Sequence, residues 1–370
     1  MNKSVRNFLL VLAALLMSVA CDRRDLNDPN ELVKILVDVN VKTVTNVTTN
    51  IRESIRLYNT NTTLWEPKLE QLDPKMMRVL VYDPGTDRLL TQSFISSATV
   101  DANGDKVFSG TLGISHGDYN LLIYNFDTPT TQVTYENSER GILAFTNEIS
   151  PSLRKAYLGV GRSNESGDTD IDDVYNGVSI HYEPEHLLVA NERDVRISPH
   201  DSLVVIHTEA QTVIDTYYLQ IRVKGLQFAS SATAVISGLS PSNHIGLNVR
   251  TVDPSAAVVF ELQKGRDMEI DGDNKDVLCA VFNTFGKIDE ITSNLYVTFN
   301  VFDTAGNLLQ YTANLDSVFD SELCHKYHWL IIEDTFIDIP DPTPGPEPTS
   351  SGGFQPKVDE WENQIGEITL

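Results

Sequence analysis

One short stretch near the N-terminus decides the fold class of this chain: Leu32-Val33-Lys34-Ile35-Leu36-Val37-Asp38-Val39-Asn40-Val41. Branched apolar residues occupy every second position of it, namely Val33, Ile35, Val37, Val39 and Val41. Successive side chains of a strand point to opposite faces of a sheet, so this alternation predicts a β-strand with one buried face. The other face is mixed in polarity.

Further stretches with strand character follow along most of the chain. Residues 77–82 lead through the turn Asp83-Pro84-Gly85-Thr86-Asp87 into residues 88–90, which predicts a hairpin. Other predicted strands lie at 119–125, 203–207, 217–223, 232–236, 257–262, 277–282, 295–302, 308–313 and 327–332. Helical signals are limited to 151–158 and 185–190, each a short helix or a turn. Many short strands separated by turn residues predict an antiparallel all-β fold.

A polar stretch at residues 191–199 separates two runs of predicted strands. The second run begins just after Pro199, at a change of composition that is typical of a domain boundary. We therefore expect two tandem antiparallel β-sandwich domains, at residues 31–190 and 195–338. A chain of 370 residues is long enough for two domains of ordinary size.

The first twenty residues have the pattern of a bacterial export signal. Lys3 and Arg6 precede an apolar run at residues 8–16, which is too short to span a bilayer. The run ends in Ser18-Val19-Ala20-Cys21, which resembles the lipobox of bacterial lipoproteins, although a hydrophobic residue is usual where Ser18 stands. We expect residues 1–20 to be a signal peptide and Cys21 to become an acylated N-terminus carrying palmitate. The alternative is an ordinary signal peptide with an unrelated cysteine.

The charge of the chain limits the partners it can bind. The formal net charge is −24 at pH 7, and removal of the signal peptide makes it more negative because Lys3 and Arg6 are lost. Such a chain repels phosphate backbones and anionic lipid head groups, which argues against nucleic acid as a partner. Membrane attachment must then come from the acyl chains on Cys21, with the polar residues 21–30 as a tether.

Two further cysteines, Cys279 and Cys324, remain after acylation of Cys21. An even pair in an exported chain could form one disulfide, and two buried free thiols fit the sequence equally well. Together with His325 and His328 the pair also has zinc-compatible side chains, but the spacing matches no usual set of zinc ligands. A disulfide or a packed core is the preferred interpretation.

Motifs for catalysis and cofactor binding are missing from the sequence. It has no GxSxG, HExxH or GxxxxGK[ST] pattern, so we expect a protein that is not an enzyme and holds no cofactor. The acidic loops 168–173 and 271–276 lack the full calcium-loop pattern, and solvated loops are the preferred interpretation. Four histidines are close in sequence, and we expect scattered side chains rather than a metal site: His181, His186, His200 and His207.

Three segments together resemble the fimbrillin-associated anchor and tip lipoproteins of Bacteroidales-type bacteria: the start Cys21–Leu26, the strand Gly117–Asn125 and the tail Gly352–Leu370. The resemblance implies two transthyretin-like sandwiches and a surface-exposed, lipid-anchored subunit of a fimbria in the outer membrane. It leaves the anchor, stalk and tip roles open. The alternative is a surface lipoprotein that does not polymerise and binds glycan or host protein through the available tryptophans, Trp65, Trp329 and Trp361.

The C-terminal segment has two parts. Residues 340–353 are rich in proline and cannot join a sheet, so they predict a stiff linker. Residues 354–370 alternate like a strand that is not stable alone. We expect this strand to add to a partner subunit, with Trp361, Ile368 and Leu370 in pockets of the partner. The alternatives are a strand that folds back on residues 195–338 or one that stays disordered until it is bound.

Overall fold

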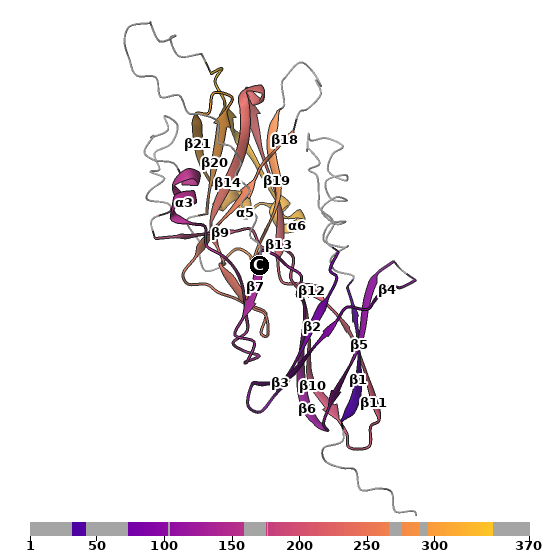
Figure 1. Cartoon of the computed structure of the whole chain (residues 1–370). Coiled ribbons are helices and arrows are strands. Elements are labelled where there is room, and N and C mark those ends of the chain that lie inside the picture. The colour runs from indigo at the N-terminus through magenta and orange to yellow at the C-terminus, as the bar shows by residue number, and fades with distance from the viewer. Residues whose placement is uncertain are drawn as a thin grey trace, which may run out of the picture.

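The structure is a computed structural model, and it describes residues 32–41, 73–102, 104–158, 175, 177–265, 276–288 and 295–342. Strands form most of this part of the chain, in five sheets of four or five strands each. Two pairs of facing sheets lie end to end in Figure 1, with the fifth sheet beside their junction. We call them the first sheet pair, which contains the N-terminal strand, and the second sheet pair.

The first sheet pair encloses the N-terminal core. Its two sheets have the strand orders β11-β1-β5-β4 and β12-β10-β6-β2-β3. The strands are β1 (Val33–Asn40), β2 (Met77–Asp83), β3 (Arg88–Ile95), β4 (Ala98–Val100), β5 (Lys106–Ile114), β6 (Gly117–Asn125), β10 (Leu188–Ile197), β11 (Leu203–Glu209) and β12 (Gln211–Thr212). The alternating apolar residues of β1 are buried between the two sheets, as the sequence predicts.

The second sheet pair encloses a larger core. Its sheets have the orders β18-β19-β13-β22 and β21-β20-β14-β17-β9. The strands are β9 (Ser179–Tyr182), β13 (Asp215–Lys224), β14 (Ala229–Leu239), β17 (Ala256–Glu261), β18 (Gln263–Gly265), β19 (Val277–Thr284), β20 (Tyr296–Asp303), β21 (Leu308–Asn314) and β22 (Trp329–Asp338). Stacked rings of Phe260 and Phe282, with centroids 4.2 Å apart, lie in this core.

Few helices accompany the strands. The helix α3 (Pro151–Leu158) forms where the sequence predicts a short helix, and Arg154 fixes it by donating to the carbonyl oxygens of Tyr175 and Val178. The others are η1 (Leu226–Phe228), α5 (Asp316–Phe319) and α6 (Glu322–Tyr327). No helix of the described ranges is long and apolar enough to cross a membrane.

A fifth sheet joins distant parts of the chain, in the order β16-β15-β8-β7. It consists of β7 (Thr131–Thr134), β8 (Leu143–Thr146), β15 (Ser242–His244) and β16 (Val249–Arg250). Its central contact pairs Ala144 with Asn243, about one hundred residues further along the chain. The segment after β6 therefore leaves the first sheet pair, contributes to this sheet and returns at β10.

The antiparallel all-β prediction is confirmed, with two local differences. Residues 185–190 are not helical, because β10 begins at Leu188 and pairs with β6. Residues 191–197 continue the same strand, with a bulge between Glu192 and Val195. Their mixed polar and apolar pattern suits a strand that has one side facing solvent. The domain limits 31–190 and 195–338 stay a prediction. Strand β9 (Ser179–Tyr182) pairs with β17 and so belongs to a sheet of the second sheet pair.

Candidate functional site

The junction between the two sheet pairs is built on an apolar cluster. The outer face of the β2–β6–β10 sheet contributes buried side chains that meet residues of the fifth sheet and of the crossing segments: Leu80, Tyr82, Leu122, Tyr124, Ile142, Ala144, Leu187, Val189, Ile214, Ile245 and Phe285. Each large apolar side chain buried in this way stabilises the folded state by about 1.5–3 kcal/mol. The junction is therefore a packed interface rather than a loose hinge.

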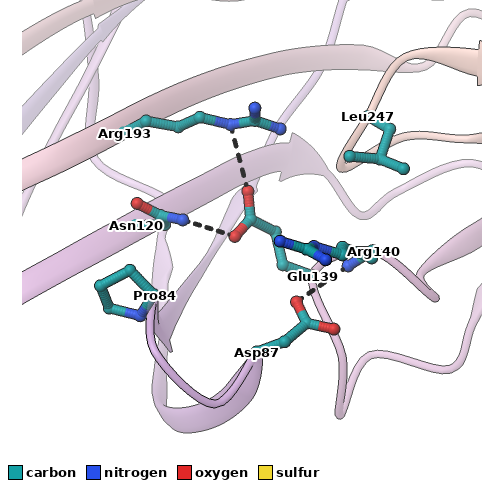
Figure 2. A pocket seen from close by; sticks show the side chains of 7 residues that line it. All are labelled: Pro84, Asp87, Asn120, Glu139, Arg140, Arg193 and Leu247. Carbon is teal, nitrogen blue, oxygen red and sulfur yellow. Dashed lines mark hydrogen bonds and ion pairs between the residues drawn. The ribbon is translucent and has the colours of Figure 1, made fainter.

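A pocket of about 340 Å³ lies beside this cluster (Figure 2). The turn before β3, strand β6, the segment after β7, the bulge of β10 and the loop after β15 all contribute to it. The lining residues are Pro84, Asp87, Asn120, Glu139, Arg140, Arg193 and Leu247. Five segments that are distant in the sequence therefore meet at this pocket.

Glu139 is the centre of the pocket, with only 5% of its surface exposed. Its carboxylate accepts a 2.6 Å hydrogen bond from Nδ2 of Asn120, and Nε of Arg193 lies 3.3 Å from its other oxygen (Figure 2). A buried carboxylate is tolerated only when it is paired in this way. Arg193 also donates from Nη2 to the carbonyl oxygen of Gly246 at 2.8 Å, so it links the β10 bulge to the loop after β15.

Gly246 is required by close approach of two backbones. A Cβ atom built at this position would lie 1.9 Å from the carbonyl oxygen of Glu139, a distance that no side chain can occupy. Asn191 donates a second hydrogen bond, of 2.7 Å, to the Gly246 carbonyl oxygen. The loop after β15 is thus pressed against the Glu139 turn and held there by two side chains of β10.

Asp87 fixes the other wall of the pocket. Its carboxylate accepts hydrogen bonds from the Ser138 hydroxyl at 2.5 Å and from the backbone N–H of Arg140 at 3.1 Å. Both carboxylates of the pocket are therefore committed to protein partners. Their hydrogen bonds and the ion pair with Arg193 hold the Glu139 turn, the turn before β3 and the bulge of β10 together.

A second cluster surrounds Arg78 on the outer face of β2. Its guanidinium lies 5.3 Å from the ring centre of Phe94 and 4.9 Å from that of Phe126, and Nη2 is 2.6 Å from a carboxylate oxygen of Glu136. Tyr124 donates its hydroxyl hydrogen bond to the same carboxylate. Burial, followed by the hydrogen bond and charge of Glu136, raises the pKa of the Tyr124 hydroxyl. About half of each phenylalanine is exposed, which leaves an aromatic surface that could contact a partner.

His186 lies buried where the chain crosses from β9 to β10. Its Nδ1 is 3.3 Å from the Thr212 hydroxyl and its Nε2 is 3.5 Å from the Thr216 hydroxyl, at the second crossing of the chain. Burial lowers the pKa of the imidazole to about 4. The neutral ring therefore joins the two segments that connect the sheet pairs.

Several of the predicted site residues cannot be placed, and one is in an unsuitable position. Cys21, Trp361, Ile368 and Leu370 lie outside the described residues, as do Trp65 and both acidic loops except Asp276. Trp329 is fully buried on β22 and cannot form an exposed platform.

The two remaining cysteines belong to different apolar clusters. Cys279 packs with Tyr218 and Trp329, whereas Cys324 on α6 packs into the core of the second sheet pair. The sequence leaves a disulfide and two free thiols open, and the structure has the thiols free and buried. Burial raises the pKa of the thiol of Cys279 to about 12 and that of Cys324 to about 11, so neither is a reactive thiolate.

The four histidines are not gathered at one place. His181 on β9 contacts the carbonyl oxygen of Thr146 on β8. His207 on β11 is exposed and lies 3.2 Å from Asp38 on β1, while His200 lies in an exposed turn. Within the ranges that the structure describes, no three His, Cys, Asp or Glu side chains are placed to hold a metal ion.

Sequence reasoning missed Glu139, Arg193 and Asn120. The segment Tyr135–Gly141 carries turn residues, which signal a loop, but nothing in it signals that Glu139 is buried. That burial depends on Gly246, more than one hundred residues away.

Residues 62–261 match the model of a family described as a domain of unknown function, DUF5119. This match spans more than half of the chain. The chain belongs to the DUF5119 family.

Comparison with curated proteins gives a relative in Bacteroides ovatus with the name "Putative fimbrium anchoring subunit Fim4B". It is 24% identical over 294 residues, which are 79% of this chain and 68% of the relative. Three short segments of the sequence predict a resemblance to fimbrial anchor and tip proteins, and this relative confirms it.

Two solved structures are also similar. A crystal structure titled as a putative adhesin from Bacteroides ovatus has a TM-score of 0.53 and 17% identity, and the alignment covers 88% of this chain and 99% of that one. It shows a shared fold. The fimbrial anchor protein Mfa2 from Porphyromonas gingivalis has a TM-score of 0.40 and 12% identity, and the alignment covers 79% of this chain and 85% of that one.

Proposed function

We propose that this protein is a cell-surface subunit of a fimbria and that its role is to anchor the fimbria to the cell. The observation that carries the proposal is the similarity, over 79% of the chain, to a protein named as a fimbrium anchoring subunit. The geometry agrees with a structural role, since the carboxylates of the Glu139 pocket are hydrogen-bonded or ion-paired to neighbouring segments of the same chain. The role that we propose is structural and not enzymatic.

Attachment to the outer membrane through acylated Cys21 completes this proposal. The apolar run at residues 8–16 and the small residues before Cys21 support it. One acyl chain gives only marginal membrane binding, whereas the two or three chains of a lipoprotein N-terminus give stable residence.

The test uses cells that lack the gene, complemented with wild-type protein or with Cys21→Ala. We expect Cys21→Ala to move the protein out of the membrane fraction and to release fimbriae into the medium, counted by electron microscopy. Arg23→Ala, in the predicted tether, is the matched control and should behave as wild type. Fimbriae that stay attached in normal number with Cys21→Ala would refute the anchoring role.

The contact with the next subunit is proposed to use residues 354–370. Strand β22 ends at Asp338, and in the sequence the proline-rich residues 340–353 connect it to this segment. Truncation after Ile339 should abolish co-purification of fimbrial subunits from detergent extracts and leave the melting temperature unchanged. A large loss of stability with intact partner binding would show instead that the segment folds back on its own chain.

One observation favours the alternative of a surface lipoprotein that binds glycan or host protein. Phe94 and Phe126 are both about half exposed, and their ring centres lie 5.5 Å apart across Arg78. Double substitution of both by alanine should weaken adhesion to a glycan or host-protein array if this surface binds. If the double variant binds the array as well as wild type does, or if wild type does not bind at all, this alternative is rejected and the fimbrial role is retained.

A further inference from the structure

We propose that the fold is a tension-bearing connector, in which a pull between the two ends of the described chain loads both terminal strands in shear. The terminal strands β1 and β22 each pair in parallel with a strand that belongs to the connection between the sheet pairs: β1 with β11, and β22 with β13. The biological source of the load rests on the proposed function, with the membrane on the N-terminal side and the fimbria on the C-terminal side.

The direction of the strands follows from the connection between them. Strand β11 ends at Glu209 and β13 begins at Asp215, so only residues 210–214 separate them, a span of about 20 Å at most. The ends of β11 and of its parallel partner β1 that lie near Glu209 and Asn40 therefore face the second sheet pair. Val33 lies at the opposite end of the first sheet pair.

The same reasoning places the other end of the chain. Since β13 starts at the junction and β22 runs parallel to it, β22 starts near the junction at Trp329 and ends away from it at Asp338. Figure 1 shows β1 and β11 together in one sheet pair and β13 beginning at the junction. Val33 and Asp338 thus lie at opposite ends of the molecule.

A pull on Val33 and Asp338 in opposite directions drives the two strands of each parallel pair, β1 with β11 and β22 with β13, past each other along their length. Strand β1 is pulled at its first residue, and β11 is pulled at its last residue through the link to β13. The seven residue pairs from Lys34 with Leu203 to Asn40 with Glu209 then share the load, and the ladder must fail as a whole. If the partners were antiparallel, the load would enter both strands at the same end, and their hydrogen bonds would break one after another.

The two ladders are not equally strong. Strand β1 is held on its other side by eight further residue pairs with β5. Strand β22 is an edge strand of its sheet, and its ladder with β13 is interrupted between Ile221 and Arg222. The β22 ladder should therefore fail first and the β1 ladder second.

The decisive experiment compares two pulling directions on the purified mature chain in a single-molecule force instrument. In one, handles are at the N-terminus and the C-terminus. In the other, one handle is at the N-terminus and the second is a peptide tag inserted after His200, in the exposed turn before β11. This second geometry pulls β1 and β11 from the same end and should unzip them.

We expect the unfolding force between the termini to be several-fold higher than the force between the N-terminus and the tag, at the same pulling speed. Forced unfolding is governed by the unfolding rate, so the comparison must be made at matched speed. The tagged protein pulled from its two termini is the matched control and should give the same force as the untagged chain. Equal or lower force between the termini would overturn the proposal.

A second variant tests the order of failure. Lys224→Cys with Asp338→Cys places cysteines at paired, exposed positions of β13 and β22. Adjacent strands are about 4.8 Å apart, within the range that a disulfide spans. The oxidised protein should lose the first unfolding step, and the reduced protein should keep it. Persistence of that step after oxidation would contradict the assignment to β22.

The two proposals fail in different ways. If Cys21→Ala leaves fimbriae attached while the force between the termini remains high, the shear arrangement stands and the fimbrial role is refuted. If the force shows no dependence on direction while fimbriae are lost from the mutant cells, the fimbrial role stands and the shear arrangement is refuted.

Discussion

Strands β1 and β22 differ in how their sheets hold them. Strand β1 lies inside its sheet, between β11 and β5, whereas β22 forms an edge, with β13 as its neighbour. An interior strand has both rows of backbone groups paired, and an edge strand leaves one row available to another chain. Among the strands that the structure describes, β1 thus has a neighbour on both sides, whereas β22 has a neighbour on one side.

The largest effect should come from a charge placed in the enclosed strand. Val37→Asp puts a carboxylate without a partner at a fully buried position of β1, which should cost at least about 4 kcal/mol of unfolding free energy. Denaturant unfolding followed by circular dichroism measures it. Lys34→Asp, on the exposed face of the same strand, should change stability by less than about 0.5 kcal/mol. Native-like stability of Val37→Asp would show that β1 is not enclosed.

The open strand should tolerate change on one face and not on the other. Ile337→Ala removes a side chain that is 1% exposed in the core of the second sheet pair and should cost about 3 kcal/mol. Phe336→Ala, at a neighbouring position that is 56% exposed, should be close to neutral. Similar losses for both variants would mean that β22 is buried on both faces.

The junction should add a dependence on pH. The pKa of His186 is lowered to about 4 in the folded protein from an ordinary value of 6.5. The unfolded chain therefore binds a proton that the folded chain rejects between these values, and stability should fall as pH drops from about 6.5 to 4, by up to about 3 kcal/mol. His186→Gln should remove this component of the pH dependence, and exposed His207→Gln should retain it. An unchanged profile in His186→Gln would assign the effect to other groups.

The smallest effect should follow from loss of the ion pair in the pocket. Glu139→Gln keeps the shape of the side chain and removes the charge opposite Arg193, whose side chain is 49% exposed. Solvent around the guanidinium screens the pair, so the loss should be about 1 kcal/mol. A double-mutant cycle with Arg193→Gln measures the coupling. Additive effects of the two substitutions would show that Glu139 and Arg193 do not stabilise the junction through each other.

Strand positions were predictable from the sequence because their signal is local. The alternation in residues 32–41 lies within one strand, the turn Asp83–Asp87 joins two consecutive strands, and both form as expected. Strand partners were not predictable, because periodicity says which face is buried and nothing about the neighbour. The parallel pairing of β1 with β11 joins residues about 170 positions apart.

The pocket was not predictable for a related reason. Glu139 resembles any acidic loop residue in the sequence, and its burial arises only when β10 brings Arg193 and the loop after β15 brings Gly246. Residues 191–197 looked like a boundary because polar side chains are frequent there, yet the backbone of this stretch is paired with β6. Polarity alone did not distinguish a connecting segment from a strand with a solvent-facing side.

The long-range pairing of β1 also sets the order in which the chain can fold during synthesis. The chain is synthesised from its N-terminus, so β1 cannot pair with β11 until residues 203–209 have been made. In the same way, β9 cannot pair with β17 until residues 256–261 have been made. Contacts between residues so far apart form slowly, and apolar strand edges are exposed in the meantime. A nascent chain that ends near residue 200 would therefore expose the edge of β1 that β11 later covers.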